Sequence, residues 1–317
     1  MNHPQAFICN SQLRATVCLP DAQTGFYRGT RFDWSGIVAS LEYRDHQYYG
    51  AWYTKFVPTV HDFAYEGKDI LAGAQSAVTG PAEEFPQPQG YDRASVGETF
   101  VKVGVGVLRK TDDSPYSCYR DYEMVDAGTW SVRPTARSVE FQQDVADARA
   151  GYGYRYRKTL SVSPTRPQLM IEHRLWNTGR RPIECEQYNH NFLTLDHAPV
   201  STDFVLTFPF RIRAPSAPDI ASIRGHQIGF VRTLANQDVA SFPIAGFGSD
   251  ARDYDIGIEN RKIGVGLRIT GSRPMTRLAL WSIRSVLSIE SFIDVSVAPG
   301  GGVMAWTYTY TYHAVET

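Results

Sequence analysis

Apolar and polar residues alternate along several short stretches of the chain. In Val303–Tyr312, Thr and aromatic residues alternate, and in Thr99–Lys110 apolar residues stand at 101, 103, 105 and 107. This period of two, with β-branched and aromatic side chains, predicts strands that bury one face. Further segments with this pattern are Tyr154–Val162, Leu169–Trp176, Asp203–Arg213 and Lys262–Thr270.

Helical patterns are scarce. No stretch has a clean apolar stripe at helical spacing, and Asp21–Gly36 and Phe56–Gly90 read as loops with one or two short helices at most. A loop as long as the second is either functional or contains elements that the pattern does not reveal. Many short strands and few short helices predict an all-β fold of stacked sheets or a barrel, and the lack of a blade-length repeat disfavours a propeller.

Two glycine-containing segments, Lys102–Val107 and Lys262–Leu267, resemble each other. If each is a strand, its two glycines lie on one face and leave a track without side chains. We expect another sheet to pack closely there, and a sugar is the alternative occupant. Neither segment opens a helix, so the dinucleotide-binding interpretation fails.

Composition and charge narrow the function classes. The 317 residues include 32 Lys and Arg against 33 Asp and Glu, which gives a net charge of −1. Because the chain has no excess of positive charge, we expect no nucleic-acid partner and no membrane partner. The 43% hydrophobic content supports a large core, and no apolar run is long enough to span a bilayer. The N-terminus lacks a secretory signal pattern. The four cysteines have no metal-site spacing, so we expect reduced thiols in a cytoplasmic protein, with a Cys9–Cys18 disulfide as the alternative.

The first candidate for chemistry is the polar segment Glu184–His197. If it is a strand, Glu186, Tyr188 and His190 share one face, and the other face is polar as well. Burying both faces in an apolar core would be costly, so the strand is expected to line a groove or form an edge. His190 is then either an acid–base group or a hydrogen-bonded structural histidine. A metal is the alternative, on Glu184, Glu186, His190 and His197, but their spacing matches no metal motif, and we expect none.

The second candidate is Glu290. It stands among Val286, Leu287, Ile289 and Phe292. Loss of solvation there would raise the pKa of the carboxyl group towards the range useful to a general base. The alternative is a structural ion pair with an arginine such as Arg284.

These segments together resemble a known family. The order of Asn189–Phe192, Ile289–Gly300 and Trp306–Tyr310 resembles the galactose mutarotase-like (aldose 1-epimerase) superfamily, and Arg31–Trp52 is similar to that family's opening hairpin. The resemblance covers roughly residues 25–312. It implies one domain over 1–317, a β-supersandwich of large twisted antiparallel sheets with a sugar cleft, in which 1–24 is an N-terminal extension or edge strand.

The resemblance also implies roles for individual residues. His190 matches the family's general acid and Glu290 its general base, and interconversion of sugar anomers by such a pair requires no cofactor and no metal. The sequence departs from the family where a second histidine is usual, and His61 is the only upstream substitute. Expected substrate-binding residues are Arg31, His61, Tyr188, Asp253 and Asp255.

Three functions remain open on this sequence. The first is an isomerase of the aldose 1-epimerase kind acting on a small-molecule carbohydrate. The second is a sugar lyase or glycoside-cleaving enzyme that uses the same acid–base pair, since the missing histidine permits a different substrate. The third is a carbohydrate-binding protein without catalysis. The chain is expected to be a monomer or a homodimer.

Overall fold

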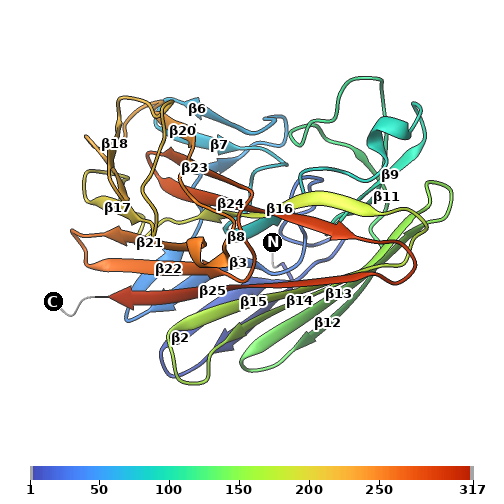
Figure 1. Cartoon of the computed structure of the whole chain (residues 1–317), viewed down its shortest axis with the longest axis horizontal. Helices are drawn as coiled ribbons and strands as arrows, with labels where there is room; N and C mark the ends of the chain where they lie inside the picture. The colour runs from blue at the N-terminus through green and yellow to red at the C-terminus, as the bar shows by residue number, and fades with distance from the viewer. Residues whose placement is uncertain (1–2, 315–317) are drawn as a thin grey trace.

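The computed structural model describes residues 3–314 and confirms the all-β prediction (Figure 1). The largest sheet has ten strands, and every neighbouring pair in it is antiparallel. In spatial order its strands are β12 (Thr129–Pro134), β13 (Ser138–Asp147), β14 (Tyr152–Val162), β15 (Gln168–Asn177), β25 (Val303–Ala314), β22 (Val265–Gly271), β21 (Asp255–Asn260), β17 (Phe204–Thr207), β19 (Gln227–Phe230) and β18 (Ala221–Arg224).

A five-stranded antiparallel sheet packs against the ten-stranded one (Figure 1). Its strands in spatial order are β20 (Val239–Pro243), β23 (Arg277–Ile283), β24 (Val286–Val297), β16 (Ile183–Phe192) and β8 (Gly80–Glu84). One hydrophobic cluster takes buried residues from both sheets, such as Ile171 and Tyr308 from one and Ile293 and Val295 from the other. The two sheets therefore form a sandwich around a common core.

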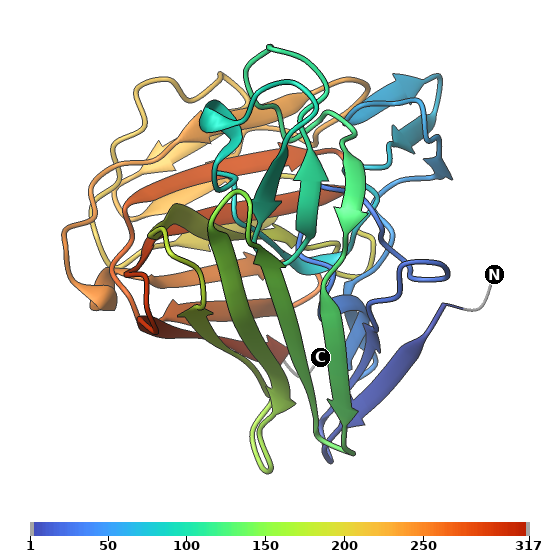
Figure 2. The ribbon, with the colours of Figure 1, turned by 90° about the vertical axis from the view of Figure 1, so that its right-hand side faces the viewer.

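Three smaller sheets and two short 3-10 helices complete the structure. The four-stranded sheet consists of β1 (Gln5–Cys9), which is its edge strand, β2 (Leu13–Cys18), β3 (Ile37–Tyr43) and β4 (His46–Tyr49). One three-stranded sheet has β11 (Glu123–Asp126), β10 (Gly106–Arg109) and β9 (Thr99–Lys102), and it stands next to β13 (Figure 2). The other has β5 (Lys55–Phe56), β7 (Asp69–Ala72) and β6 (Phe63–Glu66), and the helices are η1 (Tyr91–Arg93) and η2 (Ala251–Asp253).

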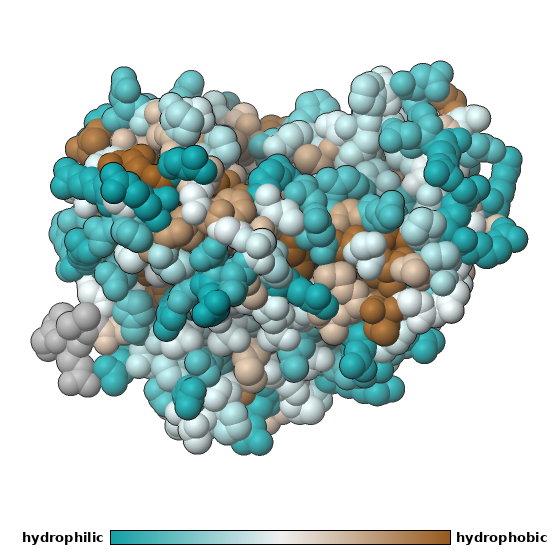
Figure 3. All heavy atoms as spheres, in the orientation of Figure 1, coloured by the Kyte–Doolittle hydropathy of each residue, from teal (hydrophilic) through white to brown (hydrophobic). Residues whose placement is uncertain are grey.

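The surface is polar over most of the face seen in Figure 3, where apolar residues gather in separate patches. Over residues 3–314, no helix has the length and apolar character that a membrane crossing requires. All four cysteines are free thiols, so the alternative Cys9–Cys18 disulfide is not formed.

Several strands differ from the sequence pattern. Thr99–Lys110 is a hairpin rather than one strand, because Gly104 has φ 78° and the amide of Val105 bonds back to the carbonyl of Lys102. Gly264 likewise lies in the turn between β21 and β22, with φ 66°. The first glycine of each pair therefore lies in a turn and only the second lies in a strand, so the expected glycine track along a strand face is wrong.

Two further predictions of loops and strands need correction. Phe56–Gly90, expected to be a loop, contains β6, β7 and β8. The expected strand over Asp203–Arg213 ends at Thr207, because Pro209 has no amide hydrogen with which to continue the ladder.

The polar strand β16 lies inside the five-stranded sheet, between β24 and β8, and residues 187–192 are buried on both faces. On one face, the buried polar side chains are satisfied by hydrogen bonds to tyrosines of the ten-stranded sheet. Asn189 donates to the hydroxyl of Tyr310 (3.0 Å), and that hydroxyl donates to Asn191 (2.9 Å). Tyr308 donates to Gln187 in the same way. The expected edge is wrong, but the other face, with Tyr188 and His190, borders a cavity.

Candidate active site

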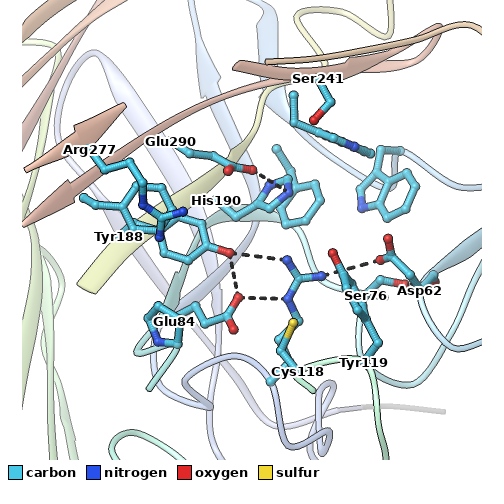
Figure 4. Close-up of a pocket in the computed structure, with 16 residues that line it drawn as sticks. Asp62, Ser76, Glu84, Cys118, Tyr119, Tyr188, His190, Ser241, Arg277 and Glu290 are labelled. Atoms are coloured by element: carbon cyan, nitrogen blue, oxygen red, sulfur yellow. Dashed lines mark hydrogen bonds and ion pairs between the residues drawn. The ribbon is translucent and has the colours of Figure 1, made fainter. Parts of the chain in front are cut away.

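A cavity of about 260 Å³ lies on the face of the five-stranded sheet that points away from the ten-stranded sheet (Figure 4). Alternate residues of β16, β23 and β24 reach it, together with Glu84 from β8, Ser241 from β20 and several loop residues. Its lining consists of Arg31, Trp52, Asp62, Ser76, Glu84, Pro86, Cys118, Tyr119, Tyr188, His190, Phe192, Ser241, Arg277, Trp281, Glu290 and Phe292. This mixture of aromatic rings and polar groups is typical of a small-molecule site.

His190 and Glu290 meet at this cavity. His190 Nε2 lies 3.2 Å from Glu290 Oε1, and their side chains are only 6% and 16% exposed. The imidazole stacks on Phe192 with 3.9 Å between ring centroids, and the edge of Trp281 approaches it at 5.1 Å. The imidazole is thus packed against aromatic rings, and both groups border the cavity.

The surroundings change the proton affinity of both groups. Burial raises the pKa of Glu290 to about 7, although the charge of Arg31 opposes this rise. Burial, reinforced by Arg31, lowers the pKa of His190 well below 6.5. The pair therefore binds one proton below about pH 7 and none above it. Since His190 Nδ1 is buried without a partner, the neutral ring is best satisfied with its proton on Nε2, facing the carboxylate.

Arg31 is the centre of the polar floor. Its Nε donates to Glu84 (2.8 Å), and its two terminal nitrogens lie 3.5 Å from Asp62 and 3.3 Å from the hydroxyl of Tyr188. A guanidinium has five N–H groups, so two remain for a ligand, and the two longer contacts can yield to one. The side chain is only 8% exposed and is therefore held in one place.

Glu84 keeps Arg31 and Tyr188 in position. The hydroxyl of Tyr188 donates to the same carboxylate oxygen as Arg31, at 2.6 Å. Lys102 Nζ stands 3.6 Å from the other oxygen. Burial would raise the pKa of Glu84, but the charges of Arg31 and Lys102 outweigh it and lower the pKa, so the carboxylate stays ionised.

Arg277 forms the rim of the cavity. Its guanidinium lies over the Phe292 ring, 3.6 Å from the centroid, and donates to Glu186 at 2.7 Å. Arg31 is likewise paired with Glu84 and Asp62. Both cationic side chains that line the cavity therefore already face carboxylates.

The structure brings four of the expected site residues to this cavity: Arg31, Tyr188, His190 and Glu290. His61 is exposed and is not among the lining residues; its neighbour Asp62 faces the cavity instead. Of the two neighbours, the carboxylate lines the cavity and the histidine does not. The sequence alone could not show which of these two neighbouring loop residues faces the cavity.

Asp253 and Asp255 do not reach the cavity either. Asp253, in η2, accepts a hydrogen bond from the amide of Gly248, and Asp255, on β21, pairs with Arg268 of β22. Both belong to the region of the ten-stranded sheet, whereas the cavity lies on the far face of the other sheet. Their contacts are those of a turn cap and a cross-strand ion pair.

Sequence reasoning missed Asp62 and Tyr119 and did not single out Lys102, and it offered Glu84 only as part of a Gly80–Phe85 loop that could rim the cleft. The available signal was the adjacent carboxylates Glu83 and Glu84 in a segment without other charges, but the loop interpretation of this region hid it. For a metal, no group of three or more His, Cys, Asp or Glu side chains in residues 3–314 is arranged to hold one. Glu184, Glu186, His190 and His197 form no such group.

Comparison with known proteins supports the fold. No family model and no curated protein matches the sequence. Among solved structures, a protein from Synechocystis sp. PCC 6803 is similar over 99% of this chain and 97% of its own, with TM-score 0.58 and 12% identity. The galactose mutarotase related enzyme from Lactobacillus acidophilus (99% and 100% covered, TM-score 0.54, 13% identity) and the GalM/aldose epimerase homologue from C. elegans (98% and 100%, 0.55, 16%) are also similar. The predicted resemblance is confirmed at the level of the fold: the chain has the galactose mutarotase-like fold.

Proposed function

We propose that this protein is a cofactor-free carbohydrate isomerase that interconverts the anomers of a sugar. The observation that carries the proposal is the contact of a buried carboxyl group with a buried imidazole, 3.2 Å apart, at a cavity lined by polar and aromatic side chains. The likeness to structures named as mutarotase and aldose epimerase homologues supports a carbohydrate ligand.

The proton balance of the reaction suits this pair. The reactive form of the pair is the one in which its single proton stands on His190, a minority form because the pKa of Glu290 lies above that of His190. In that form Glu290, as carboxylate, takes the proton of the anomeric hydroxyl, while His190, as imidazolium, gives a proton to the ring oxygen. The bond between the anomeric carbon and the ring oxygen then breaks, the aldehyde rotates, and the reverse transfers close the ring on the other face. The pair holds one proton throughout, first on His190 and then on Glu290, so its total charge does not change.

The rest of the cavity supports binding of the sugar's hydroxyl groups. Arg31 has two unused N–H groups, and Tyr188 and Asp62 supply oxygen atoms beside it. Trp281, which is only partly buried, can pack its apolar face against the C–H face of a pyranose.

The charges of the cavity favour a neutral sugar over a sugar acid or phosphate. Arg31, Arg277 and Lys102 each face a carboxylate, and Asp62, Glu84 and Glu186 balance them. Because these charges pair off, the cavity offers a phosphate no excess positive charge. We therefore expect neutral aldoses to bind more tightly than their phosphates.

Polarimetry on freshly dissolved anomers of several aldoses tests the proposal. Wild-type protein should accelerate the change in rotation, and Glu290→Gln and His190→Asn should each lower kcat about 10²–10⁴-fold, the usual contribution of a general acid or base. Asp255→Asn, which removes a carboxylate outside the cavity, serves as the control and should keep full activity. Full activity of Glu290→Gln would refute the proposal.

Other outcomes would point to the remaining functions. Binding of a sugar without any rate effect would indicate a carbohydrate-binding protein. A new ultraviolet-absorbing or reducing product from a glycoside would indicate a lyase or glycoside-cleaving enzyme.

A further inference from the structure

The segment between β10 and β11, residues 110–122, forms one wall of the cavity and has no part in the chemistry proposed above. It belongs to the small β9–β11 sheet rather than to either layer of the sandwich. Cys118 and Tyr119 of this segment both line the cavity (Figure 4).

Tyr119 lies over the guanidinium of Arg31. Its ring centroid is 4.9 Å from Arg31 Cζ, and the centroid of Phe32 is 4.5 Å from the same atom. Aromatic faces attract a guanidinium and restrict its movement. Phe32 is completely buried, whereas Tyr119 is 40% exposed. Tyr119 is therefore the ring of the two that a molecule in the cavity can reach.

The residues after Tyr119 are fixed to the body of the protein. The carbonyl of Arg120 accepts a hydrogen bond from Thr30 Oγ1 at 3.3 Å, and the carboxylate of Asp121 accepts one from Gln75 Nε2 at 3.2 Å. These contacts hold the wall on one side of the ring.

The residues before Tyr119 are fixed as well. The hydroxyl of Tyr116 accepts a hydrogen bond from Lys102 Nζ at 2.7 Å, and its ring stacks on Tyr122 with a centroid distance of 5.4 Å. Since the residues on both sides of Tyr119 are anchored to the rest of the protein, the wall is preorganised and little ordering is required on binding.

We propose that Tyr119 determines substrate specificity by limiting the bulk that a sugar can carry on the carbon next to the reacting one. This inference rests on the proposed function. When the anomeric carbon lies at Glu290, the neighbouring hydroxyl is the group that reaches Arg31, and the Tyr119 ring closes the space beyond that hydroxyl. A hydroxyl fits beside the stacked guanidinium and ring, whereas the larger acetamido group collides with the Tyr119 ring.

Binding titrations test the inference without requiring catalysis. Glucose, galactose and mannose and the 2-acetamido derivatives of these three sugars are titrated into wild type, Tyr119→Phe and Tyr119→Ala, with the fluorescence of Trp52 and Trp281 in the cavity as the signal. Wild type and the matched control Tyr119→Phe should bind the free hexose at least about tenfold more tightly than its acetamido derivative, because extra volume against a fixed wall is costly. Tyr119→Ala should remove this preference.

The outcomes separate this inference from the proposed function. A wild type without the preference, or a Tyr119→Ala variant that keeps it while its unfolding midpoint matches that of wild type, would overturn the role of Tyr119. If the sugars bind in the expected pattern but the protein does not accelerate anomer exchange, the proposed isomerase activity is overturned and the role of Tyr119 in binding stands. If none of these sugars binds wild type, both fail.

Discussion

Two neighbouring carboxylates on β8 serve two different networks of charges. Glu83 and Glu84 point to opposite faces of the sheet, as successive residues of a strand do. Glu83 faces the core, where it contacts Lys158 (3.1 Å) and His173 (2.8 Å) and accepts from the hydroxyl of Tyr156 (3.0 Å). Glu84 faces the cavity and holds Arg31.

The inner network is complete. Lys158 Nζ also contacts Asp33 (3.2 Å) and donates to the carbonyl of Ser35 (2.7 Å). Burial alone would raise the pKa of Glu83, but the charges and hydrogen bonds of His173 and Lys158 lower it to about 2. No side-chain atom of this network is among the buried atoms without a partner in residues 3–314.

The network at the cavity is incomplete. Glu84 Oε1 and His190 Nδ1 are buried without hydrogen-bond partners, and two of the three polar contacts of Arg31 are 3.3 Å or longer. Unsatisfied buried polar groups are costly, and native proteins keep few of them. The difference indicates that the inner charges stabilise the fold, whereas the outer charges are arranged for a ligand.

Lys158→Met should have the largest effect on stability, because it leaves the carboxylates of Glu83 and Asp33 buried without their cation. Breaking a buried ion pair from one side costs about 3–5 kcal/mol of unfolding free energy. Urea denaturation measures the loss. Lys68→Met, at an exposed lysine, is the control and should change stability by less than about 0.5 kcal/mol.

The same variant tests whether the two networks are separate. The protein that remains folded should exchange anomers at close to the wild-type rate. A large fall in the rate per folded molecule would show that the inner network also sets the geometry of the cavity.

Arg31→Lys should have the opposite effect to Lys158→Met, with a large loss of activity and a small loss of stability. A lysine keeps the positive charge beside Glu84 but loses the fork that also reaches Asp62 and Tyr188. We expect kcat/KM for anomer exchange to fall about 100-fold, which corresponds to about 2.7 kcal/mol of transition-state stabilisation. Stability should fall less than in Lys158→Met, and the opposite order in urea denaturation would contradict the contrast between the networks.

The sequence predicted the part of the fold that follows a regular pattern. The alternating segments Leu169–Trp176 and Val303–Tyr312 became β15 and β25 with nearly the same bounds. The polar strand with His190 and the apolar strand with Glu290 also pointed to the residues that meet at the cavity. The alternating segments and the two candidate strands could be recognised because their patterns are local: the period of a strand is visible within a few residues.

The site's floor could not be predicted in the same way. Gly80–Glu84 has the composition of a loop, yet all five residues are buried in a strand. Burial there depends on Arg31, Lys102 and Lys158, which lie far away in the sequence and neutralise the two carboxylates only after folding. The period of apolar residues along a strand carries no information about which distant residues will pair with it.

Glu290→Gln should stabilise the protein at high pH, in contrast to a change in the inner network. Glu290 ionises near its usual 4.5 in the unfolded chain but near 7 in the folded protein, so its ionisation favours unfolding as pH rises between these values. At pH 8 the variant should be more stable than wild type by about 3 kcal/mol, since each tenfold change in proton affinity is about 1.4 kcal/mol and the pKa of Glu290 rises from 4.5 to about 7. At pH 4 the difference should vanish.

Glu83→Gln is the matched comparison for that experiment. The pKa of Glu83 is lowered to about 2, so its ionised form stabilises the fold above its usual pKa, and this contribution is lost as pH falls towards 2. The Gln variant should therefore be less stable than wild type at pH 8. If both variants shift stability in the same direction there, the distinction between the two carboxylates fails.

The rate of anomer exchange should depend on pH in the way that a one-proton pair requires. Because the Glu290–His190 pair loses its proton at about pH 7, kcat should decrease about tenfold per pH unit above that value. Below pH 7 the rate should stay level until His190, whose pKa lies well below 6.5, binds a second proton. Polarimetry between pH 5 and 9 measures this profile. A rate that rises through pH 7 would mean that Glu290 acts as a base without a proton on His190, and the acid would have to be sought elsewhere in the cavity.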